Sequence, residues 1–226
     1  MRPVLEVEIW SDVVCPWCYI GKRRFERAVA EVADEIEVRA VYRPFQLDPT
    51  APTGAPTPVA DAYAKKFGGP ERAEQIIAHV TGIAAAEGIE FRMDRALRAN
   101  TLLAHRLLWL TEATGHQQAL KDRLLAAYFT DGLDIGDIDV LAACAADVGL
   151  EPERVRAFLA SDDGVAEVQQ LLREAHGDGI TAVPTFVLGT GGDGWMVPGA
   201  QDTDVFVKVF RRLVERTQGE SAATDA

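Results

Sequence analysis

The spacing of the apolar residues changes twice along the chain, and this pattern limits the possible folds more than any other feature. Residues 4–10 and 36–45 alternate between apolar and polar side chains and are rich in β-branched residues, which is typical of strands. Between them, Ile20, Phe25 and Val29 recur at near-helical spacing. The N-terminal segment therefore predicts a strand, a helix and a strand, a βαβ unit whose strands are usually parallel.

A proline-rich segment separates this unit from a long helical region. Residues 49–58 include four prolines, and no periodic pattern survives such a density. From about residue 61 to residue 176 the apolar spacing is helical, and turn signals divide the region into six or seven expected helices. Strand patterns return at 185–188 and 195–197, before a last amphipathic helix.

This order of elements predicts two domains of different class within one chain. Residues 1–50 and 178–226 are expected to form an α/β domain, and residues 51–177 an all-helical domain inserted into it. A composition of 48% apolar and 26% charged residues is ordinary for globular domains of this size.

Charge and hydropathy argue against several kinds of partner. The chain carries 35 acidic and 23 basic residues, a net charge of −12, so its field repels nucleic-acid backbones and anionic lipid headgroups. No run of about 18 apolar residues is present to span a bilayer, and the N-terminus alternates like a strand instead of forming a signal-peptide core. We therefore expect a cytoplasmic protein that binds neither nucleic acid nor membranes.

Two of the three cysteines form the motif Cys15-Pro16-Trp17-Cys18, directly after the first expected strand and at the start of the expected helix. Pro16 suits the first turn of a helix, where its missing N–H is no loss. The helix N-terminus favours a thiolate, and Trp17 adds no charge, so we expect a moderately lowered pKa for Cys15. In a redox mechanism Cys15 would be the exposed nucleophile and Cys18 would resolve the mixed disulfide.

Two other interpretations of the cysteine pair compete with the redox one. A zinc site needs three or four ligands, but the sequence has no second C-x-x-C and no H-x3–5-H motif among its four histidines, so we expect no metal. A purely structural pair is the other alternative, although packing alone gives little reason for two thiols around Pro16-Trp17. Cys144 stands alone in an apolar helical stretch and is interpreted as a small apolar residue.

These motifs resemble those of a known family. The cysteine motif after the first strand, the helical insertion and residues 181–185 before the third strand resemble the thioredoxin superfamily and, within it, the DsbA family. Further segments resemble the FrnE-like branch of that family: residues 11–21, 44–47, 100–101, 104–106, 127–129 and 199–201. The resemblance implies a thioredoxin-like fold interrupted by a helical insertion, and a thiol-disulfide oxidoreductase that needs no metal or organic cofactor.

The resemblance also implies roles for three residues outside the cysteine motif. Pro184 matches the family's cis-proline, which packs against the cysteine pair, and Val183 would offer its backbone to an extended substrate segment. From the sequence alone, the ordinary start of a strand is the favoured interpretation of Val183-Pro184. Glu8 resembles the buried acid that relays a proton to or from the resolving thiol; the alternative is that Glu6 or Glu8 lies on a solvated face.

Asn100 and His105 are candidates for substrate binding in the helical insertion. The alternative for Asn100 is that it caps the helix that carries Leu103 and Leu107. The alternative for His105 is an ordinary helix histidine whose ring nitrogens are satisfied within the protein.

The sequence thus predicts a disulfide reductase or isomerase that acts on disulfide-containing proteins or small thiols. In a cytosolic thiol pool at about −220 to −300 mV, a strongly oxidising pair would rest reduced, with glutathione as the candidate redox partner. One alternative is a glutathione-dependent enzyme of the 2-hydroxychromene-2-carboxylate isomerase or kappa transferase type, although those typically carry serine in place of Cys15. Another is a noncatalytic chaperone or binding protein. Neither the substrate nor the oligomeric state can be read from the sequence.

Overall fold

A four-stranded mixed sheet forms the framework of the molecule. The computed structural model describes residues 2–189 and 194–224, with side chains up to residue 217. The strands follow the order β2-β1-β5-β6 and are bounded as follows: β1 (Val4–Ser11), β2 (Glu37–Pro44), β5 (Thr185–Leu188) and β6 (Trp195–Pro198). β1 and β2 run parallel, whereas β5 is antiparallel to both β1 and β6. The expected βαβ unit and the two later strands are confirmed.

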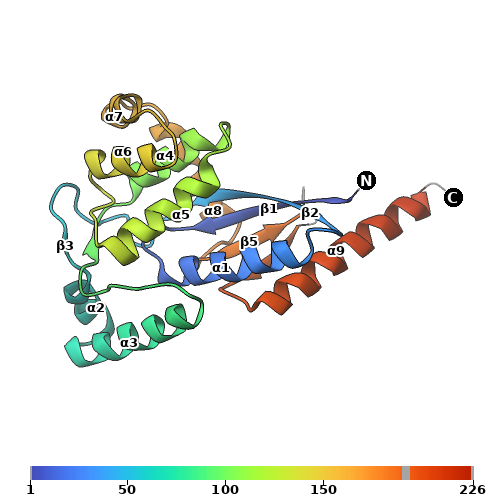
Figure 1. The fold of residues 1–226 in the computed structure, drawn as a ribbon, viewed down its shortest axis with the longest axis horizontal. Helices are drawn as coiled ribbons and strands as arrows, with labels where there is room; N and C mark the ends of the chain where they lie inside the picture. The colour runs from blue at the N-terminus through green and yellow to red at the C-terminus, as the bar shows by residue number, and fades with distance from the viewer. Residues whose placement is uncertain (1, 190–193, 225–226) are drawn as a thin grey trace.

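Helices α1 (Pro16–Glu31) and α9 (Thr203–Thr224) lie side by side against one face of this sheet (Figure 1). The core beneath them is built from alternate residues of β1 and from aromatic residues of α1, β5 and α9: Leu5, Val7, Ile9, Phe25, Phe186, Phe206 and Phe210. Because successive side chains of a strand point to opposite faces, Glu6 and Glu8 lie on the other face of the sheet.

Seven α-helices and one π-helical turn occupy the part of the structure between β2 and β5, which confirms the expected number. They are α2 (Val59–Phe67), α3 (Pro70–Ala86), α4 (Leu102–Glu112), α5 (Gln117–Ala126), η1 (Ala127–Asp131), α6 (Ile138–Asp147), α7 (Pro152–Ala160) and α8 (Val165–Gly177). A short antiparallel pair, β3 (Thr57–Pro58) and β4 (Leu97–Arg98), was not expected from the pattern. Within the described residues, no helix is long and apolar enough to cross a membrane.

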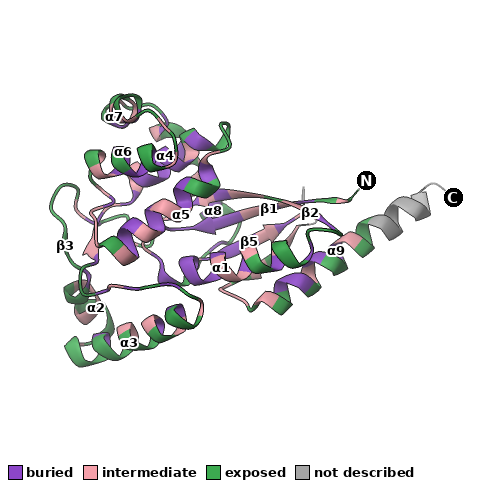
Figure 2. Cartoon of the chain, viewed as in Figure 1, coloured by how far each residue is buried: buried purple, intermediate pink, exposed green. Residues whose placement is uncertain are grey.

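The helical region shares one apolar core with the cysteine-bearing segment. Val13 and Tyr19 belong to the same buried cluster as Leu107 of α4 and Leu124 of α5, and Figure 2 shows buried residues on α1, β1 and α5. The thiol pair therefore lies where the sheet and the helical region pack together. The division into two domains at residues 51 and 178 stays a prediction.

Two glutamines fix α5 against the outer strand β2. The Gln117 amide accepts a hydrogen bond from Tyr42 N at 2.8 Å and donates one to Tyr42 O at 3.1 Å, and Gln118 Nε2 donates to Ala40 O at 2.6 Å. These side chains satisfy backbone groups that an edge strand otherwise leaves open. They also hold α5, including Lys121, in a fixed position relative to the sheet.

Candidate active site

The cysteine motif begins α1 as expected. Cys15 is the N-cap residue and Pro16 follows at the first turn. The Cys15 carbonyl accepts hydrogen bonds from Cys18 N at 3.1 Å and Tyr19 N at 3.3 Å, which places Cys18 one turn further along the helix. Both thiols are free and only 3% exposed, whereas Trp17 between them is 39% exposed.

The loop before β5 lies directly against the cysteine motif. The Val183–Pro184 peptide bond is cis, as the resemblance implies, and Cys15 Sγ lies 3.6 Å from the Val183 carbonyl oxygen. Further along α1, a Cβ atom added to Gly21 would lie 3.0 Å from Pro184 Cγ. A glycine at this position therefore lets the helix and the loop approach each other closely.

A groove of about 580 Å³ starts beside Cys15. Val14, the residue before Cys15, lines it together with Leu47, Tyr63 and Tyr128. Burial, together with the nearby Cys15, raises the pKa of Tyr63 to about 12, which places the Tyr63 ring close to the nucleophile. The groove thus offers apolar side chains next to the thiol that a substrate must reach, and charged residues, among them Lys65 and Lys66, line it as well.

The protonation of the two thiols is linked. Burial raises the pKa of Cys15 well above its ordinary value, and the neighbouring Cys18 raises it further. Burial also opposes ionisation of Cys18, but a hydrogen bond from Cys15 and the charge of Lys121 outweigh it and lower the pKa of Cys18. The expectation of a lowered pKa for Cys15 is therefore wrong for this structure, because the loss of solvent outweighs the helix N-terminus.

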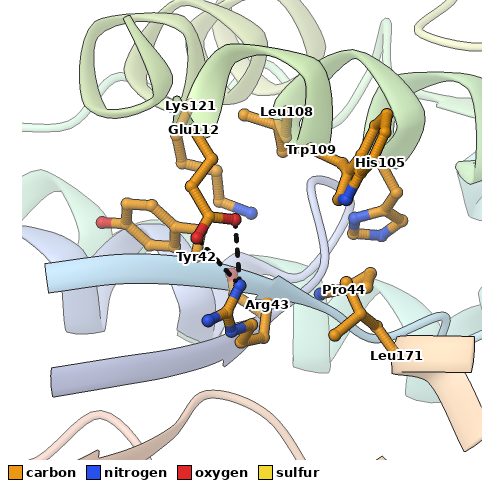
Figure 3. A pocket seen from close by; sticks show the side chains of 10 residues that line it. Tyr42, Arg43, Pro44, His105, Leu108, Trp109, Glu112, Lys121 and Leu171 are labelled. Carbon is orange, nitrogen blue, oxygen red and sulfur yellow. Dashed lines mark hydrogen bonds and ion pairs between the residues drawn. The ribbon is translucent and has the colours of Figure 1, made fainter. Parts of the chain in front are cut away.

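Lys121 of α5 is a site residue that the sequence analysis missed. It is fully buried, and its Nζ lies 5.2 Å from the centre of the Tyr42 ring (Figure 3). Burial lowers the pKa of Lys121 from 10.5 to about 8, although Cys18 and Asp12 favour its charged form. A signal was available in the sequence, since Lys121 stands one turn before the apolar pair Leu124 and Leu125 on the same helix face.

Asp12 is a second buried site residue that the sequence analysis missed, and it explains the position of His105. The Asp12 carboxylate accepts hydrogen bonds from Val13 N and Leu47 N, both at 2.8 Å. His105 Nε2 lies 3.1 Å from Asp12 Oδ1 and 3.1 Å from Phe45 O, and since both are acceptors, Nε2 carries the proton. His105 thus reaches the active-site loop through Asp12, and its Nε2 is satisfied within the protein. Its role in substrate binding stays a prediction.

Glu8 does not lie beneath the cysteines, and the proton-relay interpretation of this residue is wrong. Its side chain is 42% exposed and accepts a hydrogen bond from Arg43 Nε at 2.8 Å. The physical reason is the alternation of β1, in which Val7 and Ile9 face α1 and Glu8 faces the opposite side of the sheet. Glu8 therefore occupies the solvated face that was the alternative.

Asn100 connects the start of α4 to the proline-rich segment. The N-cap residue of α4 is Thr101. Asn100, the residue before it, accepts the hydrogen bond from Leu102 N through its Oδ1 at 3.0 Å and so performs the expected capping role. Asn100 Nδ2 also donates to Ala51 O at 3.0 Å. Its role in substrate binding stays a prediction.

The third cysteine lies apart from the pair. Cys144 of α6 is fully buried in the apolar core of the helical region, which fits its interpretation as a small apolar residue. Among the side chains of residues 2–189 and 194–217, no three His, Cys, Asp or Glu groups gather where they could hold a metal ion.

A buried dithiol at a helix N-terminus, facing a cis-proline loop on a four-stranded mixed sheet, defines the thioredoxin-fold class of dithiol proteins. Comparison with known families gives the particular family. Residues 6–211 match the DSBA-like thioredoxin domain, and the chain belongs to this family of thiol-disulfide oxidoreductases. The assignment to the FrnE-like branch stays a prediction.

Several solved structures are similar to this chain along most of its length. A probable DsbA oxidoreductase from Streptomyces coelicolor is 38% identical, with a TM-score of 0.83 over 92% of this chain and 89% of that one. A 2-hydroxychromene-2-carboxylate isomerase is 14% identical, with a TM-score of 0.67 over 95% and 98%. The cytosolic disulfide reductase DsbM from Pseudomonas aeruginosa, also solved with GSH, is 19% identical, with a TM-score of 0.64 over 93% and 98%. The last two similarities show the fold alone.

Proposed function

We propose that the protein reduces or isomerises disulfides, with Cys15 as the nucleophile and Cys18 as the resolving thiol. The observation that carries this proposal is the 3.6 Å contact between Cys15 Sγ and the Val183 carbonyl oxygen at the start of the cis-proline loop. An extended substrate segment paired with the Val183 backbone would present its disulfide to Cys15. The adjoining groove would receive the apolar side chains of a protein substrate, or the body of a small disulfide.

The proposed reaction proceeds by two thiol-disulfide exchanges. The Cys15 thiol loses its proton to solvent and its thiolate attacks one sulfur of the substrate disulfide; the other substrate sulfur leaves as a thiolate and takes up a proton from solvent. Cys18 then attacks Cys15 Sγ, which releases the second substrate thiol and forms the Cys15–Cys18 disulfide. The substrate gains two electrons and the enzyme loses two, so an external thiol must reduce the enzyme disulfide before the next cycle.

We propose glutathione as that reductant and the cytoplasm as the compartment. A cytosolic thiol pool at about −220 to −300 mV favours the reduced pair and hence reduction or isomerisation over oxidation. The similarity to a disulfide reductase described as cytosolic, and solved with GSH, supports both choices. No metal or organic cofactor takes part in the proposed cycle.

A glutathione redox titration of the purified protein tests this function. After quenching with an alkylating reagent, mass mapping should locate a reversible Cys15–Cys18 disulfide that disappears in Cys15→Ser and in Cys18→Ser. Cys144→Ser is the matched control and should titrate like the wild type, because Cys144 lies in a separate part of the core.

Other outcomes of the titration would favour the alternatives. Glutathione adducts at Cys15 without an internal disulfide, together with isomerase turnover in Cys18→Ser, would support a glutathione-dependent isomerase or transferase. If no disulfide forms and Cys15→Ser leaves the binding of unfolded protein unchanged, the protein acts as a noncatalytic chaperone.

A further inference from the structure

We propose that Lys121 accepts the proton of Cys18 when Cys18 resolves the mixed disulfide. This inference rests on the dithiol function proposed above and names the base that the second exchange requires. Glu8, the residue in which a relay was expected, lies on the opposite face of the sheet, so the proton must go elsewhere.

Lys121 differs from the other buried lysine near the cysteines in having no hydrogen-bond or ion-pair partner among the described residues; its Nζ lies over the Tyr42 ring instead. Lys22 of α1 forms ion pairs with Glu26 and, at 3.0 Å, with Asp122. By contrast, neither Lys121 Nζ nor the nearby Ser11 hydroxyl has a hydrogen-bond partner among the described residues, although both are buried. An unpartnered buried amine costs stability, so its presence beside the thiols needs a reason other than folding.

Lys121 and Ser11 line the same small cavity, of about 10 Å³, between β2 and helices α4 and α5 (Figure 3). Figure 3 shows Lys121 beside the Tyr42 ring, with the Arg43–Glu112 ion pair and His105 further along the wall. The titratable and charged groups that surround Lys121 are Cys15, Cys18, Lys22, Asp12, Tyr42, Arg43, His105 and Glu112. They come from four sides: α1, the loop after β1, strand β2 and helix α4.

Among Lys121 and the groups around it, Lys121 alone has a charge close to Cys18 and an amine that forms no hydrogen bond to a described residue. Asp12 is the fully buried carboxylate among them, but its oxygens already accept hydrogen bonds from Val13 N, Leu47 N and His105. Glu112 is partly exposed and bound to Arg43. Lys121 and Ser11 both favour the thiolate of Cys18, and Lys121 has a pKa of about 8, so about a tenth of it is neutral near pH 7.

The proposed step is balanced in atoms and charge. The Cys18 thiol gives its proton to the neutral Lys121 amine, which leaves a thiolate beside an ammonium. The thiolate attacks Cys15 Sγ, a Cys15–Cys18 bond forms, and the bond between Cys15 and the substrate sulfur breaks. The substrate leaves as a thiolate, and the proton of Lys121 passes to it or to solvent, since a buried ammonium beside a neutral disulfide is disfavoured.

Stopped-flow reaction of the reduced protein with 5,5′-dithiobis(2-nitrobenzoate), in a Cys144→Ser background, separates the two exchanges. Attack by Cys15 releases one coloured thiolate, and resolution by Cys18 releases the second. In Lys121→Met, the first release should stay within about threefold of the wild type, whereas the second should slow by at least about tenfold near pH 7 and recover as the pH rises. Lys22→Met is the matched control, and both of its phases should stay within about threefold.

Two results would overturn the inference. One is a second phase that is unchanged in Lys121→Met, and the other is a second phase that slows equally in Lys22→Met. Lys121→Arg keeps a cation but cannot accept a proton, so it should also resolve slowly; a wild-type rate in this variant would refute proton transfer. It also provides the test if Lys121→Met fails to fold. Failure of the proposed dithiol function gives a different result, because the wild type itself would then release only one coloured thiolate.

Discussion

Two neighbouring residues, Ser11 at the end of β1 and Asp12 directly after it, take part in buried polar clusters of opposite character. Asp12 is fully satisfied: its carboxylate holds Val13 N, Leu47 N and His105. Ser11, one residue earlier, lines the same small cavity as Lys121, and neither side chain has a hydrogen-bond partner in the described part of the chain. Both clusters lie within reach of the same dithiol.

We interpret the Asp12 cluster as one that stabilises the fold, and the Ser11–Lys121 cluster as one that supports the thiol reaction and lowers the stability. The satisfied cluster joins three segments of the chain, through hydrogen bonds that span 35 and 93 residues from Asp12. The side chains of the unsatisfied cluster form no hydrogen bond or ion pair among the described residues, and the Lys121 ammonium lies over the Tyr42 ring instead. This interpretation predicts that removing a member of the first cluster destabilises the protein, whereas removing a member of the second does not.

The largest expected effect is the loss of stability in Asp12→Ala. This change leaves the N–H groups of Val13 and Leu47 without their acceptor and removes one of the two acceptors of His105 Nε2, at about 1–3 kcal/mol for each unsatisfied group. We expect the free energy of unfolding to fall by about 4 kcal/mol in urea denaturation followed by tryptophan fluorescence. A loss below about 1 kcal/mol would remove the distinction between the clusters.

Lys121→Met should increase the free energy of unfolding, in contrast to Asp12→Ala. The pKa of Lys121 is lowered from 10.5 to about 8, mainly by burial, and this difference corresponds to about 3 kcal/mol of destabilisation by the charged form. A methionine of similar length removes that penalty, so the variant should unfold at a higher urea concentration than the wild type at pH 7. Lys22→Met should instead lose about 1 kcal/mol, because its ion pairs to Glu26 and Asp122 are partly exposed.

The pH dependence sharpens this prediction for Lys121. Since the folded pKa lies below the unfolded one, the unfolded chain binds more protons between pH 8 and about 10.5, and wild-type stability rises through that window. Below pH 8 the amine is protonated in both states and the penalty is complete. The stability advantage of Lys121→Met, measured on reduced protein, should therefore fall by more than half between pH 7 and about pH 9.5. A constant advantage would mean that Lys121 does not titrate in this range.

The sequence predicted the order of strands and helices well, because local periodicity determines both. It also placed Cys15 at the helix start, since Pro16 and the end of β1 mark that position within a few residues. The two buried polar clusters around Asp12 and Lys121 could not be predicted from local periodicity. Asp12 obtains its partners from Leu47 and His105, and the contact between α5 and the cysteine-bearing helix depends on packing over long sequence distances. Glu8 shows the reverse case, because the alternation of β1 already placed it opposite Val7 and Ile9.

The smallest expected effect is that of Ser11→Ala, and it tests whether Ser11 belongs with Lys121. The Ser11 hydroxyl is buried without a partner, so replacing it by a methyl group should leave the free energy of unfolding within about 1 kcal/mol of the wild type or raise it slightly. The hydroxyl favours the Cys18 thiolate, so the second exchange should slow by about twofold to fivefold while the first is unchanged. A loss of stability comparable to that of Asp12→Ala would place Ser11 in the satisfied cluster and leave Lys121 as the single member of the other.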